Sequence, residues 1–507
     1  MNESASLSFK DKRELFQRFS ADQVDNDSIR QCSRPVCLPV SFIQEQVIGA
    51  ELVGLYDPKK IRVNCPSLCY LIKGSINISI LDKTLCEIVR RHEILRTSYG
   101  VAEKQIFQII NDPPDNILQV TDLRGMARET GKNEAERILA EITSNPFSFF
   151  DNPLMISATL IITGDDESIL IVVTNHIATD GLSMMVLQSE LFVLYQAFLF
   201  NTPSPFPELP IQYADFAIWE RNRYSDEFLE KKLAYWRNIP GTTNTFLPMD
   251  RIPTSLSYVG DIVPVTILPE LVKRLMLLGR DCSATLFTVL FSAFILLIHV
   301  FSGYKCNFFC MPVANRARKE THSLIGCFMN FQFVHIDMEG NPTFVELVER
   351  VGKTLLDVYD NYIPFHFITA SIPPQGPVVD FQLYTAMDLA APSTMRDVPT
   401  SDSNALKQGE VISAPASQLQ AGSFAAIPFK LSQQSEFALF PIDVFLSGTS
   451  GGINGHFRYQ TAIYDRATIL KLVNDYVVLL MKLVRNPALR IRETGVEEHE
   501  SISADRM

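Results

Sequence analysis

A proline-rich segment near the middle of the chain is the sequence feature that most restricts its fold. Residues 201–210 (NTPSPFPELP) contain four prolines and directly follow a long apolar stretch. Because proline interrupts regular structure, this segment predicts a crossover between two structural units. A chain of 507 residues is also too long for one ordinary core. We therefore expect one lobe over residues 1–200, a second lobe over 201–490, and a disordered acidic tail over 491–507.

The first half alternates strand-like and helix-like patterns. Apolar residues alternate at 75–81, which predicts a strand, and a helix is expected around 83–92. Two apolar, β-branched runs at 155–163 and 168–174 are joined by the polar sequence GDDE, a pattern typical of a hairpin. A long helix is predicted at 181–200. Further predicted elements are a helix at 10–19, a strand at 105–110 and a helix at 133–143.

The second half shows the same alternation of helix and strand patterns, so we expect an α/β (α+β) fold class with mixed sheets. Residues 284–300 carry no full charge and are almost long enough to cross a membrane. They include Thr285, Ser292 and His299, and we favour a buried helix over a membrane span. Residues 388–425 show no period and are interpreted as a long surface loop. Other predicted elements are helices at 270–278, 343–359 and 466–484, and strands at 307–312, 330–337, 436–446 and 455–459.

Charge and cysteine content argue against several functional classes. A net charge of -12 leaves no basic face for nucleic acid. The first residues lack the apolar core of a signal peptide. Nine cysteines are scattered along the chain, and neither Cys65/Cys69 nor Cys306/Cys310 has the partners of a zinc motif. We expect reduced thiols, no bound metal, and a monomeric cytoplasmic protein without nucleic-acid or membrane partners.

The sequence after the second run of the predicted hairpin has the pattern of a catalytic loop. The strand pattern ends at Thr174, His176 follows almost at once, and Asp180 and Gly181 precede the long helix. A strand end can hold an imidazole rigidly beside a cavity, where it can accept a proton near neutral pH. Asp180 is suited to pair with an arginine, and Gly181 permits a tight turn. Taken alone, this short motif is explained more simply by a structural histidine.

An ordered series of further motifs changes that interpretation. The series is PVSFIQEQ at 39–46, RHEILRT at 91–97, NHIATDG at 175–181, YADFAIW at 213–219, LPMDR at 247–251, PVANR at 312–316, IGCFMN at 325–330 and NYIPF at 361–365. From about residue 35 to 490, the chain resembles the condensation domains of nonribosomal peptide synthetases, here in a free-standing form. The order and spacing of the motifs are far more specific than any one of them.

The resemblance implies a fold and a reaction. Condensation domains are pseudo-dimers of two chloramphenicol-acetyltransferase-like lobes, arranged in a V with a central tunnel. A carrier protein delivers the donor acyl group on its phosphopantetheine arm. The chain is expected to transfer this acyl, aminoacyl or peptidyl group from the thioester to an amine or hydroxyl. The acceptor is held on a second carrier protein or is a free small molecule, and no bound cofactor is expected.

The resemblance also implies roles for individual residues. His176 aligns with the second histidine of the family's H-H-x-x-x-D-G motif, which is assigned to catalysis. It is expected to accept the acceptor's proton, or to position the acceptor and stabilise the intermediate. Asp180 is expected to form a salt bridge that shapes the site, with Arg316 as the first candidate partner and Arg96 as the second. Asn330 is expected either to face the tunnel or to be a plain strand residue.

Asn175 is the departure from the family's motif, which usually has histidine at this position. Because an amide can still donate and accept hydrogen bonds, we favour an active enzyme. The alternative is a catalytically degenerate module that binds carrier proteins or recruits a partner. Heterocyclising relatives carry D-x-x-x-x-D here, so cyclodehydration is disfavoured. The chain also lacks the D-F-G-W-G motif of plant-type acyltransferases that use coenzyme A.

Overall fold

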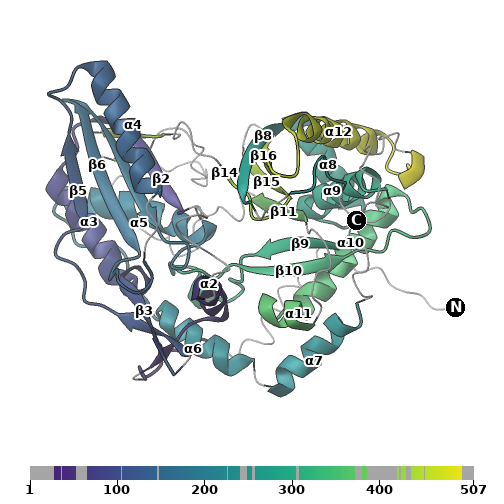
Figure 1. Ribbon diagram of the computed structural model, residues 1–507, viewed down its shortest axis with the longest axis horizontal. Coiled ribbons are helices and arrows are strands. Elements are labelled where there is room, and N and C mark those ends of the chain that lie inside the picture. The colour runs from purple at the N-terminus through teal and green to yellow at the C-terminus, as the bar shows by residue number, and fades with distance from the viewer. Residues whose placement is uncertain are drawn as a thin grey trace.

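The computed structural model describes residues 28–35, 37–52, 65–103, 105–144, 148–224, 226–239, 248–253, 257–303, 308–371, 379–384, 419–421, 424–429, 436–449 and 452–493. These residues form two lobes that open from a common base like a V (Figure 1). The predicted helix at 10–19 and the part of the predicted tail from 494 onward lie outside the described residues.

The first lobe is built on a six-stranded mixed sheet. Its order is β12 (Leu419–Ala421), β13 (Phe424–Pro428), β2 (Ser67–Gly74), β7 (Glu167–Thr174), β6 (Ile156–Gly164) and β5 (Leu118–Asp122). Side chains alternate across each strand, so Leu170 and Val172 of β7 face one core while Ile169 and Ile171 face another. Helices α3 (Ile78–Arg91) and α5 (Gly181–Leu199) cover the first face, and α4 (Arg128–Ser144) covers the second.

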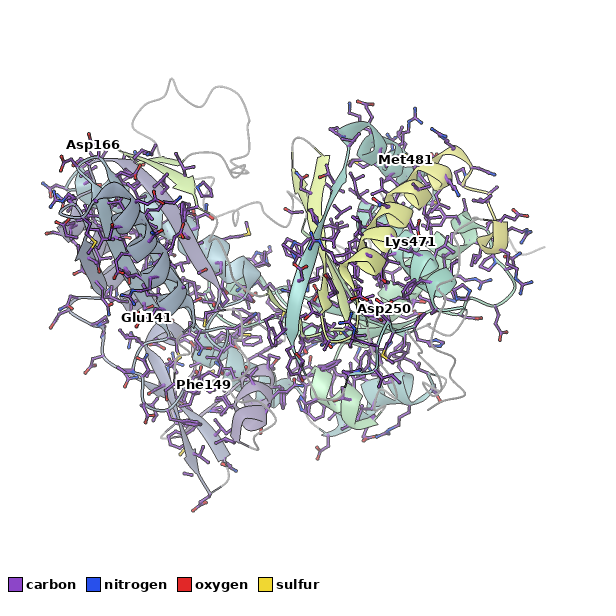
Figure 2. All side chains as sticks on the ribbon, turned by 45° about the horizontal axis from the view of Figure 1, so that its top comes forward. Glu141, Phe149, Asp166, Asp250, Lys471 and Met481 are labelled. Carbon is purple, nitrogen blue, oxygen red and sulfur yellow. The ribbon has the colours of Figure 1, made fainter. Side chains whose placement is uncertain are left out.

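The second lobe is built on a seven-stranded mixed sheet. Its order is β10 (Asn330–His335), β9 (Phe308–Val313), β11 (Val379–Tyr384), β15 (Ile442–Thr449), β16 (Gly452–Gln460), β8 (Val259–Ile267) and β14 (Glu436–Phe437). One face packs on α8 (Pro269–Asp281), α9 (Leu286–Phe301), α10 (Phe344–Asp360) and α12 (Arg466–Arg485). Helices α8, α9 and α12 lie on the side away from the first lobe (Figures 1 and 2). The prediction of a buried helix at 284–300 is confirmed, because nearly every residue of α9 is buried.

The remaining elements join the lobes at the base of the V. A small sheet of β1 (Leu38–Pro39), β4 (Gln105–Ile110) and β3 (Thr97–Ala102) lies beside helix α2 (Phe42–Leu52). Helices α6 (Tyr213–Arg223), α7 (Asp226–Arg237) and α11 (Phe365–Ser371), and 3-10 turns η1 (Glu93–Arg96), η2 (Lys319–Thr321) and η4 (Ile491–Glu493), complete the fold. Helix α5 has the length and apolar composition of a membrane span, but it packs against α3 and β2 inside the first lobe.

The predicted boundary between residues 200 and 201 does not separate the two lobes in space. Tyr213 and Phe216 of α6 belong to the apolar core of the first lobe, as do Leu324 and Phe328 from the second half of the sequence. Strand β13 also pairs antiparallel with β2. The second half of the chain therefore contributes two parts to the first lobe: the loop that carries Leu324 and Phe328, and the strands β12 and β13 at one edge of its sheet.

Three predicted elements need correction. Residues 75–81 are not a strand, because Asn77 caps α3 and its side chain accepts a hydrogen bond from the Ile80 amide. The predicted loop at 388–425 lies mostly outside the described residues, but it contains β12 and the start of β13. The predicted strand at 436–446 is two strands, β14 and β15. The other predicted strands and helices among the described residues are confirmed, although several ends differ.

Candidate active site

The loop that carries His176 is closed tightly at both ends. Strand β7 ends at Thr174, whose hydroxyl lies 2.7 Å from the Thr179 hydroxyl across the loop. The amide of Asn175 donates to the Met155 carbonyl at 2.9 Å. The Asn175 side-chain oxygen accepts from the Ile177 amide at 2.9 Å, an Asx-turn that folds the backbone around His176. The loop therefore holds its shape without the histidine that the family usually has at position 175.

His176 differs from its neighbours in its environment. Asn175 and the residues from Ile177 to Asp180 are buried, whereas His176 is half-buried. Among the residues that the structure describes, no hydrogen bond or ion pair engages its imidazole. The polar atoms of the ring are consequently available to a substrate group, as those of a general base must be.

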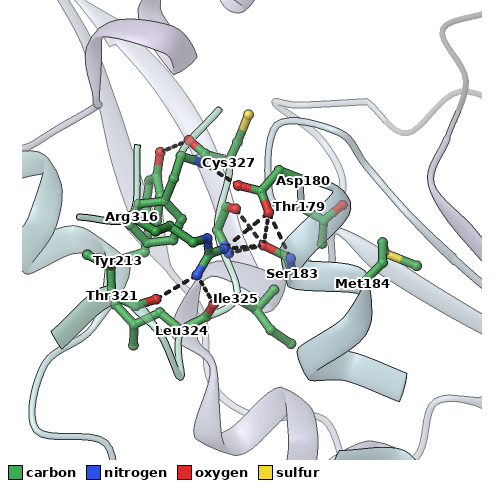
Figure 3. Close-up of polar contacts among 12 residues, drawn as sticks. Thr179, Asp180, Ser183, Met184, Tyr213, Arg316, Thr321, Leu324, Ile325 and Cys327 are labelled. Atoms are coloured by element: carbon green, nitrogen blue, oxygen red, sulfur yellow. Dashed lines mark hydrogen bonds and ion pairs between the residues drawn. The ribbon is translucent and has the colours of Figure 1, made fainter. Parts of the chain in front are cut away.

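Asp180 has the opposite character, because both of its oxygens are occupied. It caps α5, and its Oδ1 accepts from the Ser183 amide at 2.8 Å and from Arg316 Nη2 at 3.1 Å (Figure 3). Its Oδ2 accepts from the Phe328 amide at 3.0 Å. Both oxygens of Asp180 are thus engaged in contacts that hold the start of α5.

Arg316 anchors the segment that reaches into the first lobe, residues 314–329, which we call the interlobe loop. Its Nη1 donates to the carbonyls of Thr321 at 2.6 Å and Leu324 at 2.9 Å within this loop. Its Nη2 also donates to the Ser183 hydroxyl at 2.7 Å, and its guanidinium lies 4.1 Å from the centroid of the Phe328 ring. The Asp180–Arg316 ion pair thus joins the start of α5 to the interlobe loop.

Gly326 allows the interlobe loop to approach this closely. A Cβ atom at this position would lie 2.1 Å from the Tyr213 ring, which leaves no room for any other residue. The Ser183 hydroxyl accepts from the Gly326 amide at 3.0 Å, and the Tyr213 hydroxyl donates to the Cys327 carbonyl at 2.6 Å. Ser183 and Gly326 were not among the predicted site residues. Two sequence features could have identified them: the glycine lies in the IGCFMN motif, and the serine lies three residues after the residue that caps a helix.

These contacts describe a half-buried histidine on a loop locked between two lobes. Residues 37–501 match the family model described as "Condensation domain". The chain belongs to the condensation-domain family. The resemblance in the motifs is therefore confirmed over most of the sequence.

Known relatives support this assignment. The chain is 31% identical over 463 residues to one of the linear gramicidin synthase subunits of Brevibacillus parabrevis, covering 90% of this chain and 9% of that protein. The chain thus spans a small part of such a synthetase.

Solved structures share the fold. The X-domain in its complex with OxyB from teicoplanin biosynthesis is similar with a TM-score of 0.74, at 21% identity, over 92% of this chain and 97% of that one. The first condensation domain of the calcium-dependent antibiotic synthetase, solved with a substrate analogue, has a TM-score of 0.67 at 17% identity, over 91% and 99% of the two chains. The expected pseudo-dimer of two chloramphenicol-acetyltransferase-like lobes is confirmed.

In this condensation domain, two of the expected site residues lie elsewhere. Arg96 is wrong as a partner of Asp180, because its Nη1 donates to the carbonyl of Asn111 in the first lobe. Asn330 is 5% exposed, and both ends of its amide are engaged in the second lobe. Its Nδ2 donates to the Tyr362 hydroxyl at 2.8 Å and its Oδ1 accepts from the Phe365 amide at 3.2 Å. This favours the alternative of a structural strand residue.

Two further residues close to the loop are Gly181 and Cys327. Gly181 is exposed at the first position of α5. Cys327 is buried, and this burial, reinforced by the charge of Asp180, raises the pKa of its thiol. A protonated buried thiol is a weak nucleophile.

Proposed function

We propose that this condensation domain transfers an acyl, aminoacyl or peptidyl group from a carrier-protein thioester to an amine or hydroxyl acceptor. The observation that carries the proposal is the half-buried His176 imidazole, which has no partner among the described residues and sits on the loop locked by Asp180 and Arg316. The acceptor arrives on a second carrier or as a free small molecule.

The chemistry needs one base and no resident cofactor, because the thioester is already activated. The acceptor nitrogen or oxygen bonds to the thioester carbonyl carbon while its proton passes to His176. Collapse of the tetrahedral intermediate breaks the carbon–sulfur bond, and the imidazolium returns the proton to the departing phosphopantetheine thiolate. General-base assistance of this kind contributes about 10²- to 10⁴-fold in rate. Asp180 cannot take this role, since its oxygens already accept four hydrogen bonds.

The test is His176→Ala in the purified chain, with an acyl-loaded carrier protein and a panel of amines and alcohols. Mass spectrometry should show product formation falling by about 10²- to 10⁴-fold. His335→Ala is the matched control, because His335 is also half-buried but lies on β10 in the second lobe. Circular dichroism checks that both variants fold. Wild-type rates in a folded His176→Ala variant would overturn the assignment.

A second candidate is a module that binds carriers or recruits another protein without catalysing transfer. The X-domain of similar fold was solved together with OxyB, and the departure at Asn175 is the feature of this chain that favours such a role. Against it, the Asn175 side chain closes the loop through the Ile177 amide and leaves His176 accessible. The same incubation separates the two: a module would bind the loaded carrier and yield no transferred acyl group.

A further inference from the structure

A buried glutamine of α2 reaches the peptide group that follows His176. Gln44 is fully buried, and its Nε2 lies 3.4 Å from the Ile177 carbonyl and 2.8 Å from the Tyr99 hydroxyl. Its Oε1 accepts from the Ser41 amide at 3.0 Å. Every polar atom of this side chain therefore has a partner, and one partner belongs to the active-site loop.

The partners of Gln44 fix the orientation of its amide. The Ser41 amide can only donate, so the side-chain atom that faces it must be the oxygen. The Ile177 carbonyl can only accept, so the atom that faces it must be the nitrogen. An uncharged amide meets both demands at once, whereas a carboxylate would oppose the carbonyl with a buried negative charge. The position therefore requires glutamine for a specific arrangement of donors and acceptors.

The position of the His176 imidazole depends strongly on its backbone, since no hydrogen bond or ion pair from a described residue orients the ring. The backbone before His176 is held by the Asn175 amide bonded to Met155. On the other side, Gln44 supplies a side-chain bond to the Ile177 carbonyl from outside the loop. A displacement of a catalytic group by about 1 Å can lower a rate by about 10²-fold. A contact at this point thus acts directly on the placement of the ring.

We propose that Gln44 is a positioning residue for His176, acting through the Ile177 carbonyl. The inference rests on the proposed acyl transfer. The same helix end is tied to the interlobe loop, because the Ser41 hydroxyl lies 2.9 Å from the Tyr213 hydroxyl, which donates to the Cys327 carbonyl. The position of the interlobe loop is thereby linked to the position of the His176 ring. The link runs through Tyr213 of α6 and through Ser41 and Gln44 at the start of α2.

The test is Gln44→Met, which keeps the side-chain length but removes the amide. Gln46→Met is the matched control, since Gln46 lies on the same helix and is only half-buried. We expect kcat to fall by about 10- to 100-fold for Gln44→Met with KM unchanged, because ground-state binding is not touched. Equal kcat values for the two variants would overturn the inference.

A double-mutant cycle separates positioning from general support of the fold. In a His176→Ala background, Gln44→Met should not slow the residual reaction further, because the ring it positions is gone. An additive loss in that background would show that Gln44 acts on the fold and would overturn the inference. If Gln44→Met does not fold, Tyr99→Phe serves instead, since it removes one of the two acceptors that orient the Gln44 amide.

A third measurement keeps this inference separate from the proposed function. The ring resonances of His176, observed by NMR, should shift in Gln44→Met and stay unchanged in Gln46→Met. If the wild-type chain transfers no acyl group, the proposed function fails, and these resonances alone decide whether Gln44 positions the ring. Unchanged His176 resonances in Gln44→Met would contradict the positioning role whatever the activity.

Discussion

Two buried aspartates, one in each lobe, differ in the groups that surround their carboxyl oxygens. Asp180 is 3% exposed and accepts hydrogen bonds from an arginine, a hydroxyl and two backbone amides. Asp380 on β11 is fully buried and lies beside Asp443 of the neighbouring strand β15. Its Oδ2 accepts from Gln382 at 2.6 Å, while its Oδ1 is buried and has no hydrogen-bond partner among the described residues.

The difference lies in the charges that surround each carboxyl group. Asp180 faces the guanidinium of Arg316 at 3.1 Å. At the second site, the guanidinium of Arg458 donates to the neighbouring carboxylate, Asp443, at 2.9 Å. Burial first, and then the charge of Asp443, raise the pKa of Asp380 well above its usual value. Two similarly buried carboxyl groups thus differ in the donors and the positive charge that face them.

The first prediction exchanges each aspartate for the isosteric asparagine, and Asp180→Asn has the larger effect. The new amide would face the Phe328 amide with a donor and leave Arg316 as a buried charge without its partner. Breaking a buried ion pair from one side costs about 3–5 kcal/mol. The free energy of unfolding, measured by urea denaturation, should fall by about this amount.

Arg316→Met provides the comparison for that measurement. Because both variants break the same ion pair, the double variant should be only slightly less stable than either single one. If Asp180→Asn lowers the free energy of unfolding by less than about 1 kcal/mol, the Asp180–Arg316 pair is no stronger than a surface ion pair. That result would contradict the difference drawn between the two aspartate sites.

Asp380→Asn should have the opposite sign, and its effect should grow with pH. The folded state holds a proton that the unfolded state releases above the ordinary aspartate pKa of 3.8. The stability that Asp380 contributes is therefore complete below that value and is lost as pH rises toward the raised folded pKa. Asparagine does not ionise, so the variant should gain stability relative to the wild type by about 1.4 kcal/mol per pH unit in this range.

Thermal or urea unfolding at several pH values measures this difference. Asp166→Asn is the control, because Asp166 is exposed at the turn between β6 and β7, at the outer end of the first lobe (Figure 2). Its stability difference from the wild type should stay flat with pH. An equally flat difference for Asp380→Asn would show that Asp380 is ionised in the folded state.

Much of the fold and one of these two sites could be predicted from the sequence. The hairpin before His176 and the helix after it follow from local apolar patterns, and α5 begins one residue after Asp180, as a capping aspartate requires. The strand predicted at 75–81 was wrong because the alternation of apolar residues outweighed the capping role of Asn77. Local apolar patterns located the helices and strands. At residues 75–81, however, the capping hydrogen bond of Asn77 decided that a helix begins there and not a strand.

The contacts that join distant segments could not be predicted in this way. The pairing of Asp380 with Asp443 depends on which strands become neighbours, and no periodicity reports that β11 lies beside β15. Arg316 was already ranked before Arg96 as the partner of Asp180, but the contact itself depends on the path of the interlobe loop. The role of Gln44 likewise depends on α2 lying beneath the active-site loop.

The smallest expected effect concerns Asn175, whose side chain makes one neutral hydrogen bond in the loop that Asp180 anchors. Asn175→Ala should lower the free energy of unfolding by about 1 kcal/mol, the usual contribution of such a bond. Asn152→Ala is a close control, because Asn152 accepts from the Leu154 amide at 3.0 Å in the same type of turn, outside the active-site loop. Both variants should lose similar stability, but only Asn175→Ala should slow acyl transfer. Equal rates would mean that the Asx-turn is dispensable for catalysis and that the other contacts of the loop hold His176 in place.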